Sequence, residues 1–429
     1  MARLEYINYT PTHLFFKDGK LQRRAARNES QIARLPQLFW QDGTPWREAN
    51  LWAQQRATES TVDIKTVISQ AGSLAYYASW LEKEQINWWD FPARKADRCL
   101  IRFRGELIRR RDSGSLAPST TAKRMRDVIS LYRWLSKSKL LVPEWPMWTD
   151  KQAKLIIQNK YGFERTMTIP TTDLAIKNGS RPGERLEDGL LPVSAADRDV
   201  ILTFAREHAS TELYLLLTLG FYTGMRIGTL CDLKIQTLNN AVPDPAAEGL
   251  YRLNVGPGAV PSVSTKHGVT GQVWITKMHL EVLSEYYYST RRLLREAKAS
   301  PEHKSNIFLT RFGNPYIKLK GSQSSAINVE MHSIRKKASA HNIKSMSGFH
   351  FHQSRCTYAT ELAKLIIPIA GSINALAIIK HALLHKDEAT TLKYIKFVER
   401  SPAKIAFANE FTKSFLKIQS AFSEMRNDA

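Results

Sequence analysis

The sequence is poor in cysteine. Its 429 residues include only three, Cys99, Cys231 and Cys356, and no two of them stand at the spacing of a metal-binding pair. A disulfide framework or a cysteine-based metal site is therefore not expected. We expect buried or free thiols in a reducing compartment.

Long apolar runs, targeting signals and repeats are also missing. No apolar run in the sequence approaches the length of a membrane span, and the first ten residues, MARLEYINYT, lack the apolar core of a signal peptide. We find no internal repeat and no low-complexity tract. These absences predict a soluble cytoplasmic protein without a membrane partner.

Acidic residues are scarce relative to basic ones. The chain has 62 lysines and arginines against 40 aspartates and glutamates, which gives a formal net charge of +22. An excess of this size favours a polyanionic partner, either nucleic acid or an anionic membrane surface. The length allows two or three domains with cores of their own.

Tryptophan is unevenly distributed, because nine of the ten lie before residue 150 and only Trp274 lies beyond. This shift in composition indicates separate domains on either side. In the first part, residues 1–57 hold a basic cluster, Lys20-Leu-Gln-Arg23-Arg24-Ala-Ala-Arg27. The cluster is either the solvated face of an extension packed on the next domain or an accessory DNA-binding arm.

Residues 58 to 142 show helical periodicity. We expect helices from about Thr61 or Asp63, over Ala96–Arg111, and from Pro118 onward. The last of these has apolar residues on one side and cations on its other faces, which is typical of a helix laid against a phosphate backbone. The alternative is a solvated basic face. The predicted DNA-binding residues are Lys123, Arg124, Arg126 and Arg133.

Another arginine follows a glycine turn in the second half of the chain. Ser194 is expected to cap a helix, and a second helix should run from Thr211 to Tyr222. The run Thr223-Gly224-Met225-Arg226 comes next. The glycine lets the chain turn tightly before a helix whose first turn presents the guanidinium. That planar fork can hold two nonbridging phosphate oxygens.

The stretch from His352 to Tyr394 brings together residue types that suit phosphodiester chemistry. His352 stands three residues before Arg355, His385 thirty residues after that arginine, and Tyr394 nine residues after His385. Cations can neutralise phosphate oxygens, imidazoles can handle protons, and a hydroxyl can serve as nucleophile. Together they supply what a phosphodiester exchange needs without a metal.

The order and spacing of these residues resemble the tyrosine recombinase (phage integrase) family. That family has H-x-x-R followed by T-x-A-T, here Thr357-Tyr358-Ala359-Thr360, and a histidine box nine residues before the nucleophilic tyrosine. It also has the upstream T-G-x-R box. The chain departs from the family at Leu384, where a glycine is usual, and at Thr229, where a glutamate is usual. The segment Ser119–Arg124 resembles the family's core-binding domain more loosely.

The resemblance implies a mainly α fold with a small β-sheet (α+β), in which a helical core-binding domain and a catalytic domain form a clamp around duplex DNA. The expected segments are an N-terminal extension or arm (1–57), a helical DNA-binding domain (58–150), a linker (151–190), a catalytic domain (191–400) and a tail helix (401–429).

The resemblance also implies roles for single residues. Tyr394 would attack the scissile phosphate to give a 3′-phosphotyrosyl link and a free 5′-hydroxyl, while Arg226 and Arg355 hold the nonbridging oxygens. Lys266, on a turn seven residues before Val273, matches the family's hairpin lysine and would protonate the leaving oxygen.

Two histidines complete the implied site. His352 would assist proton transfer at the nucleophile, and His385 would hydrogen-bond the phosphate. Because the covalent link preserves the phosphodiester energy, no ATP, metal or other cofactor is expected.

The predicted function is that of a site-specific recombinase of the integrase type, acting on a mobile element in the nucleoid of the cytoplasm. The implied partners are double-stranded DNA and further copies of the chain, as a dimer on one site and a tetramer on two, with room for accessory DNA-bending or directionality proteins. The alternatives are a type IB topoisomerase-like relaxing enzyme and a catalytically inactive DNA-binding protein of the same fold.

The tail is predicted to be a helix with one apolar stripe. That stripe would dock on its own domain or on a neighbouring subunit. Its members are Phe407, Phe411, Phe415, Ile418 and Phe422.

Overall fold

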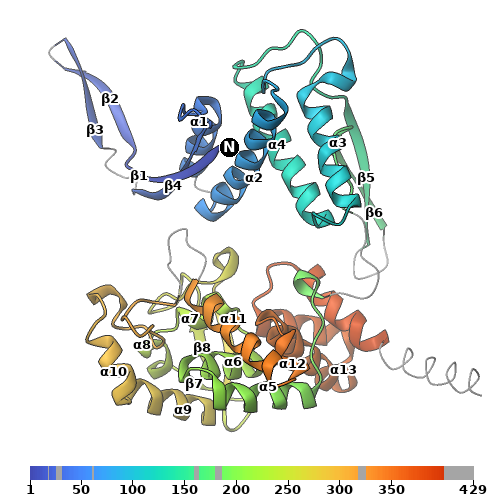
Figure 1. Ribbon diagram of the computed structural model, residues 1–429. Helices are drawn as coiled ribbons and strands as arrows, with labels where there is room; N and C mark the ends of the chain where they lie inside the picture. The colour runs from blue at the N-terminus through green and yellow to red at the C-terminus, as the bar shows by residue number, and fades with distance from the viewer. Residues whose placement is uncertain are drawn as a thin grey trace, which may run out of the picture. The chain divides into compact units, whose positions relative to one another are not determined.

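A computed structural model describes residues 1–17, 19–25, 31–59, 62–158, 164–178, 186–316 and 325–400. The chain divides after Pro182 into two compact units, called here the first and the second unit (Figure 1). The prediction for the tail, 401–429, lies outside the described residues.

Four helices make up the body of the first unit (Figure 1). The Asp63 carboxylate caps the second of them by accepting a hydrogen bond from the Lys65 amide, and Pro118 begins the fourth, as the sequence predicted. They share one aromatic-rich core that includes Trp52, Tyr77 and Phe103. The helices are α1 (Arg47–Thr58), α2 (Ile64–Glu84), α3 (Cys99–Asp112) and α4 (Pro118–Lys137).

The strands of the first unit form three separate antiparallel pairs. Strand β1 (Arg3–Tyr9) pairs with β4 (Ile32–Phe39). The pair β2 (Thr12–Lys17) and β3 (Lys20–Ala25) carries part of the N-terminal basic cluster. Strands β5 (Asp150–Gln158) and β6 (Glu164–Thr172) make the third pair.

The first segment packs on the helices that follow it, which was one of the two expectations for residues 1–57. Leu38 of β4 and Trp52 of α1 are buried in the same core as α2 to α4. Residues 151–190 are more than a linker, because they hold β5 and β6, and because Leu174 and Ile176 join that core. Pro170 of β6 pairs with Gln152 in a two-stranded sheet, where a proline is tolerated.

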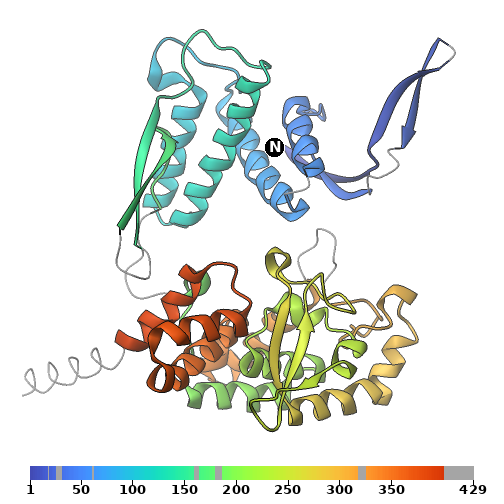
Figure 2. The same cartoon turned by 180° about the vertical axis from the view of Figure 1, so that it is seen from behind.

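The second unit combines helices with a three-stranded antiparallel sheet in the order β7-β8-β9. Figure 2 shows this sheet in yellow-green tones next to the helices. Its strands are β7 (Val242–Pro243), β8 (Leu250–Val255) and β9 (Gly271–Thr276). Strand β9 lies against α6, α9 and α13. The helices are α5 (Ala195–His208), α6 (Thr211–Thr223), α7 (Ile227–Cys231), α8 (Ile235–Asn239), α9 (Lys277–Tyr288), α10 (Thr290–Glu296), α11 (Ser325–Ala340), α12 (Lys344–Ser347) and α13 (His352–Leu383).

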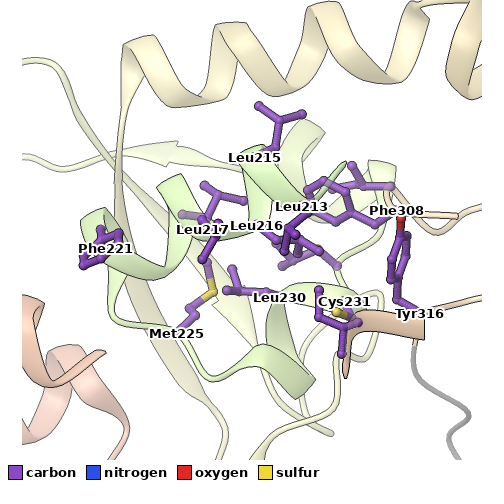
Figure 3. Packing of buried hydrophobic residues seen from close by; sticks show 14 of the residues in the cluster. Leu213, Leu215, Leu216, Leu217, Phe221, Met225, Leu230, Cys231, Phe308 and Tyr316 are labelled. Atoms are coloured by element: carbon purple, nitrogen blue, oxygen red, sulfur yellow. The ribbon is translucent and has the colours of Figure 1, made fainter. Parts of the chain in front are cut away.

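Helix α6 runs through the middle of this unit. It is apolar on nearly every side, as expected for a helix surrounded by protein, and Leu213, Leu216 and Leu217 pack toward Leu230 and Phe308 (Figure 3). The Ser194 hydroxyl caps α5 by accepting from the Asp197 amide, as predicted. The rigid core around α6 fixes the position of the turn that follows it.

Among the described residues, α13 is long and apolar enough to cross a membrane by length and composition alone. The expectation that no apolar run approaches such a length was therefore wrong. The helix is broken at Gly371, whose φ of 71° and ψ of 165° are not helical, and Pro368 lies just before the break. Its first part carries Arg355 and buries Ala359 and Ala363 in the second unit. Around the break the apolar side chains of Leu365, Ile369 and Ile373 are exposed, so only part of the helix packs in the core of this unit.

Candidate active site

Arg226 follows a turn that only glycine can make. Helix α6 ends at Gly224, where φ is +65° and a Cβ would lie 2.3 Å from Cδ1 of Tyr358. Two residues later Arg226 is the N-cap of α7. Its Nη2 lies 2.5 Å from Oε1 of Glu187. The T-G-x-R box thus aims a guanidinium into a buried site.

Arg355 lies in the first turn of α13 and is only 2% exposed. Its Nη1 donates to the Gly224 carbonyl (2.6 Å) and its Nη2 to the Leu383 carbonyl (2.8 Å). Its Nε donates to Oε2 of Glu187 at 3.1 Å. Burial and the nearby Arg226 lower the pKa of Arg355, and Glu187 opposes that shift. Backbone carbonyls from two segments therefore fix the orientation of this guanidinium.

The two predicted histidines face the same carboxylate. Nε2 of His352 lies 3.7 Å from Oε2 of Glu187, and Nε2 of His385 lies 3.4 Å from the same atom. His385 is buried, and its Nδ1 lies 2.8 Å from the Thr391 hydroxyl. Burial lowers the pKa of His385, while Glu187 raises it. A neutral His385 protonated at Nε2 would donate to the carboxylate and accept from Thr391.

Leu384 stands where the sequence resemblance leads one to expect glycine. Its φ of 52° and ψ of 47° are left-handed, and it ends α13 immediately before His385. Its side chain lies against Gly271 at the start of β9, where a Cβ would come within 2.5 Å of the leucine Cδ2. A leucine therefore makes the left-handed turn before His385, and its side chain packs against β9.

Tyr394 lies on the helix formed by residues 388–400 and is completely buried. Its hydroxyl donates to Oε2 of Glu187 at 3.4 Å and lies 3.7 Å from Sγ of Cys356. Its ring is stacked beside that of His385. Burial, followed by the proximity of Cys356 and Glu187, raises the pKa of Tyr394 well above its ordinary value. The phenol is therefore protonated and closed to solvent in this state.

Lys266 completes the predicted set. It opens a single helical turn, Lys266–Gly268, between β8 and β9, and its side chain is exposed. It lines a small cleft together with Arg226, Arg355 and Thr229. The structure thus brings all six predicted site residues together, although they come from separate segments of the chain.

Glu187 stands at the centre of the site, and no local pattern in the sequence selects it. It begins a short turn, Glu187–Gly189, and is 8% exposed. Burial raises the pKa of Glu187. Hydrogen bonds from His352 and His385 and the charges of Arg355 and Arg226 outweigh that effect and hold this pKa far below its usual range. The carboxylate is therefore ionised.

A signal for Glu187 did exist. Thr229 stands where the sequence resemblance leads one to expect a glutamate. The predicted site therefore contained Arg226 and Arg355 but no acidic residue to pair with them. Buried charges are rarely left without a counterion. The turn signal Asp188-Gly189 lay just before the predicted catalytic domain, but nothing in its local pattern pointed to the site.

The four predicted DNA-binding residues on α4 divide into two pairs. Lys123 makes an ion pair with Asp127 (2.6 Å), and Arg124 lies 3.6 Å above the ring of Tyr76, so both have contacts inside the first unit. Burial lowers the pKa of Arg124, partly offset by Tyr76. By contrast Arg126 and Arg133 are exposed and, seven residues apart, share one face of the helix.

The second unit matches a known protein family. Residues 194–399 match the model of the phage integrase family. Curated protein sequences gave no significant match. Among solved structures, a lambda integrase(75-356) dimer bound to a COC′ core site is 14% identical with a TM-score of 0.46, covering 81% of this chain and 94% of that one. The Tn1549 transposon integrase (aa 82-397) in complex with circular intermediate DNA is 13% identical with a TM-score of 0.47 and the same coverages.

Proposed function

We propose that this protein is a tyrosine recombinase that cuts and rejoins duplex DNA, because residues 194–399 match the model of the phage integrase family. We further propose that it acts at specific sites, as an integrase of a mobile element. The chemistry would run through a 3′-phosphotyrosyl intermediate on Tyr394.

One observation carries this proposal. Two guanidiniums, two imidazoles and a tyrosine hydroxyl, drawn from separate segments of the sequence, converge on the two oxygens of one carboxylate. Such a cluster binds an oxyanion, and a phosphodiester presents two nonbridging oxygens in a similar way. A hydroxyl nucleophile at the edge of an oxyanion site is the arrangement that phosphoryl transfer requires.

The residues then have defined tasks. The Tyr394 oxygen forms a bond to phosphorus as the bond from phosphorus to the 5′-oxygen breaks, and the phenol proton leaves with assistance from His352. Lys266 donates a proton to the departing 5′-oxygen. Arg226 and Arg355 stabilise the charge that develops on the nonbridging oxygens, and His385 adds a hydrogen bond. Attack by another 5′-hydroxyl reverses the step on a new strand.

DNA binding would use both units. The net charge of +22 supplies a strong nonspecific attraction to the phosphate backbone. The exposed Arg126 and Arg133 provide an α4 face suited to phosphate contacts, and the two units would close around the duplex as a clamp. We propose dimers on single sites and tetramers on paired sites, in the nucleoid of the cytoplasm.

A second candidate is a DNA-binding protein of this fold without cleavage activity. Two observations favour it. Tyr394 is completely buried, and a carboxylate already fills the site where a phosphate would bind. The candidates differ in whether a covalent protein–DNA adduct can form at all.

The test uses DNA that flanks the gene and carries short direct repeats, prepared as a duplex nicked so that a covalent intermediate is trapped. Wild type should form an adduct that survives denaturation and persists in EDTA. Tyr394→Phe should bind the same duplex but form no adduct. No adduct with wild type on any flanking repeat would support the inactive candidate, and relaxation of a random plasmid would support a type IB topoisomerase.

A further inference from the structure

The carboxylate of Glu187 leaves no place for a phosphate. Oε1 contacts Arg226, while Oε2 contacts Arg355, His385 and the Tyr394 hydroxyl. These are the groups that the proposed function assigns to the scissile phosphate and its attack. Two anions sharing these donors would repel each other strongly in a poorly solvated site.

We propose that Glu187 is an internal substitute for the scissile phosphate, and that DNA cleavage requires the turn formed by residues 186–190 to leave the site. This inference rests on the proposed function above, because it assigns a DNA phosphate to the same donors. In the absence of DNA, the chain would then be inhibited by its own Glu187.

Glu187 and a phosphodiester carry the same charge. Glu187 brings one negative charge to the buried Arg355 and the partly buried Arg226, and a phosphodiester also carries one negative charge. Withdrawal of Glu187 without a replacement would leave the buried Arg355 without an anionic partner, which is unfavourable. The turn should therefore stay in place until a phosphate takes over its contacts. In this scheme the DNA phosphate displaces the carboxylate and so activates cleavage.

The same turn contributes to the buried cluster that contains the nucleophile. Leu186 is 4% exposed and belongs to this cluster together with Tyr394. The turn closes on itself through a hydrogen bond from the Leu186 amide to the Leu190 carbonyl (3.0 Å). Withdrawal of this compact turn would thus remove the competing anion and also one apolar residue of the cluster that buries Tyr394.

The segment after the turn is fastened to α13. Nε2 of Gln353 donates to the Leu191 carbonyl (3.1 Å), and the Val193 amide donates to the Thr357 hydroxyl (3.0 Å). Movement of residues 186–190 would therefore start from this fixed segment.

A permanent supporting role for Glu187 is the rival interpretation. In that case the carboxylate would replace the glutamate missing at Thr229 and would keep the arginines in place during cleavage. The two interpretations predict opposite effects of removing the charge. If Glu187 is a substitute for phosphate, removing its charge should speed cleavage. If Glu187 is a permanent support, removing its charge should slow cleavage.

The first experiment measures anion binding without DNA. The full-length wild type, Glu187→Ala, Glu187→Gln and the control Glu388→Gln are unfolded thermally in sodium phosphate and in sodium chloride of equal ionic strength. Glu388 is a suitable control because it is an exposed glutamate of the same unit, paired at 3.3 Å with Lys380. We expect phosphate to raise the Tm of the two Glu187 variants by about 3 °C or more. Wild type and Glu388→Gln should respond much less. An equal response in all four proteins would overturn the proposal.

The second experiment measures the rate of adduct formation on the nicked duplex at saturating protein. We expect Glu187→Gln to react roughly ten times faster than wild type and Glu388→Gln, which corresponds to removal of a modest competing interaction. A slower rate with unchanged DNA binding would establish the supporting role and refute the substitute. If no protein forms an adduct, the proposed function fails, while the phosphate response still decides whether Glu187 blocks an anion site.

A third measurement needs no substitution, which matters if the Glu187 variants fold poorly. Hydrogen exchange of wild type is followed across residues 186–190 with and without the flanking-repeat duplex. Withdrawal of the turn predicts faster exchange of the Gly189 and Leu190 amides, which now donate to Leu186 and Glu187 carbonyls at 3.2 Å. Unchanged or slower exchange in the bound state would contradict withdrawal.

Discussion

Two buried glutamates, Glu187 and Glu212, gather arginines in the second unit, and they do so from different kinds of structure. Glu212 lies in the first turn of α6, and its partners Arg291 and Arg295 are neighbours on α10. Glu187 lies on a short turn, and its partners come from α7, α13 and segments beyond it. In the Glu212 cluster, the glutamate and the arginines both lie on helices. In the Glu187 cluster, the glutamate lies on a turn.

The difference separates a structural ion cluster from an exchangeable one. The Glu212 carboxylate also accepts from Tyr286 at 2.9 Å, and its side chain has no exposed surface. Replacing that carboxylate would require helices to move apart. At Glu187 a small movement of a five-residue turn would free the same kind of charges. Helix α6 joins the two, with Glu212 at its start and the Gly224 turn at its end.

The largest effect is expected at the arginines of the exchangeable cluster. Arg226→Ala and Arg355→Ala should each reduce the rate of adduct formation by about 100-fold or more, with modest loss of DNA binding, because they act on the charge of the transition state. Lysine at either position should not restore the rate, since a point charge cannot replace a planar fork. Near-normal adduct formation by either alanine variant would mean that another arginine holds the phosphate.

The structural cluster should respond in stability instead. Glu212→Gln should lower the free energy of unfolding by about 3 kcal/mol, since it leaves buried Arg295 without its partner. Denaturant unfolding in phosphate and in chloride measures this free energy. Because packed helices surround Glu212, phosphate should not restore the stability lost in Glu212→Gln. Phosphate should partly restore the stability lost in Glu187→Gln. Equal rescue of both variants would remove the distinction between the clusters.

Lowering the pH should reduce the contribution of Glu187 to the free energy of unfolding. Its pKa is lowered on folding, so its stabilising effect is fully present above the ordinary value of 4.5 and is lost as the pH falls below it. His385, whose pKa is also lowered, adds a loss that begins below its ordinary value of 6.5. Unfolding curves from pH 8 to pH 3 should therefore show a shallower decline below pH 4.5 for Glu187→Gln than for wild type. Parallel declines would mean that Glu187 is not ionised against these partners.

A smaller effect is expected on α4. Arg126→Ala and Arg133→Ala should each weaken DNA binding and reduce the magnitude of the salt slope by about one, as expected for loss of one phosphate contact. Lys123→Ala should leave the salt slope unchanged, because its ammonium is paired with Asp127. Binding curves over a range of salt concentrations test this. Equal slopes for all three variants would place the DNA contact on another face.

The smallest effect is expected at the turn before His385. Leu384→Gly relieves a left-handed backbone, worth roughly 1 kcal/mol, but it gives up the contact of the leucine side chain with Gly271. We expect a change in unfolding free energy within about 1 kcal/mol and retained cleavage. A large loss of cleavage with normal stability would show that the side chain has a further role in the site.

The sequence was sufficient for the parts of the site that depend on local pattern. The T-G-x-R turn, the pair His352 and Arg355 on one helical face, and the interval from His385 to Tyr394 each define a local geometry, and the structure brings them together. Capping by Asp63 and Ser194 followed from the same kind of local chemistry. Family spacing then linked these separate pieces.

What the sequence could not provide was the long-range pairing of charges. Glu187 lies 168 positions from Arg355, and no periodicity or motif marks it. Lys123 and Arg124 read as surface cations, but the fold gave them Asp127 and the ring of Tyr76 as partners. In each case a tertiary contact, invisible in local pattern, decides whether a charge is available to a ligand.

The most direct test of the account is to identify the residue that carries DNA. Wild type is trapped on the nicked flanking-repeat duplex, digested with nuclease and protease, and analysed by mass spectrometry. We expect a nucleotide attached through its 3′-phosphate to the peptide that contains Tyr394. A nucleotide on any other residue, or attached through a 5′-phosphate, would contradict it.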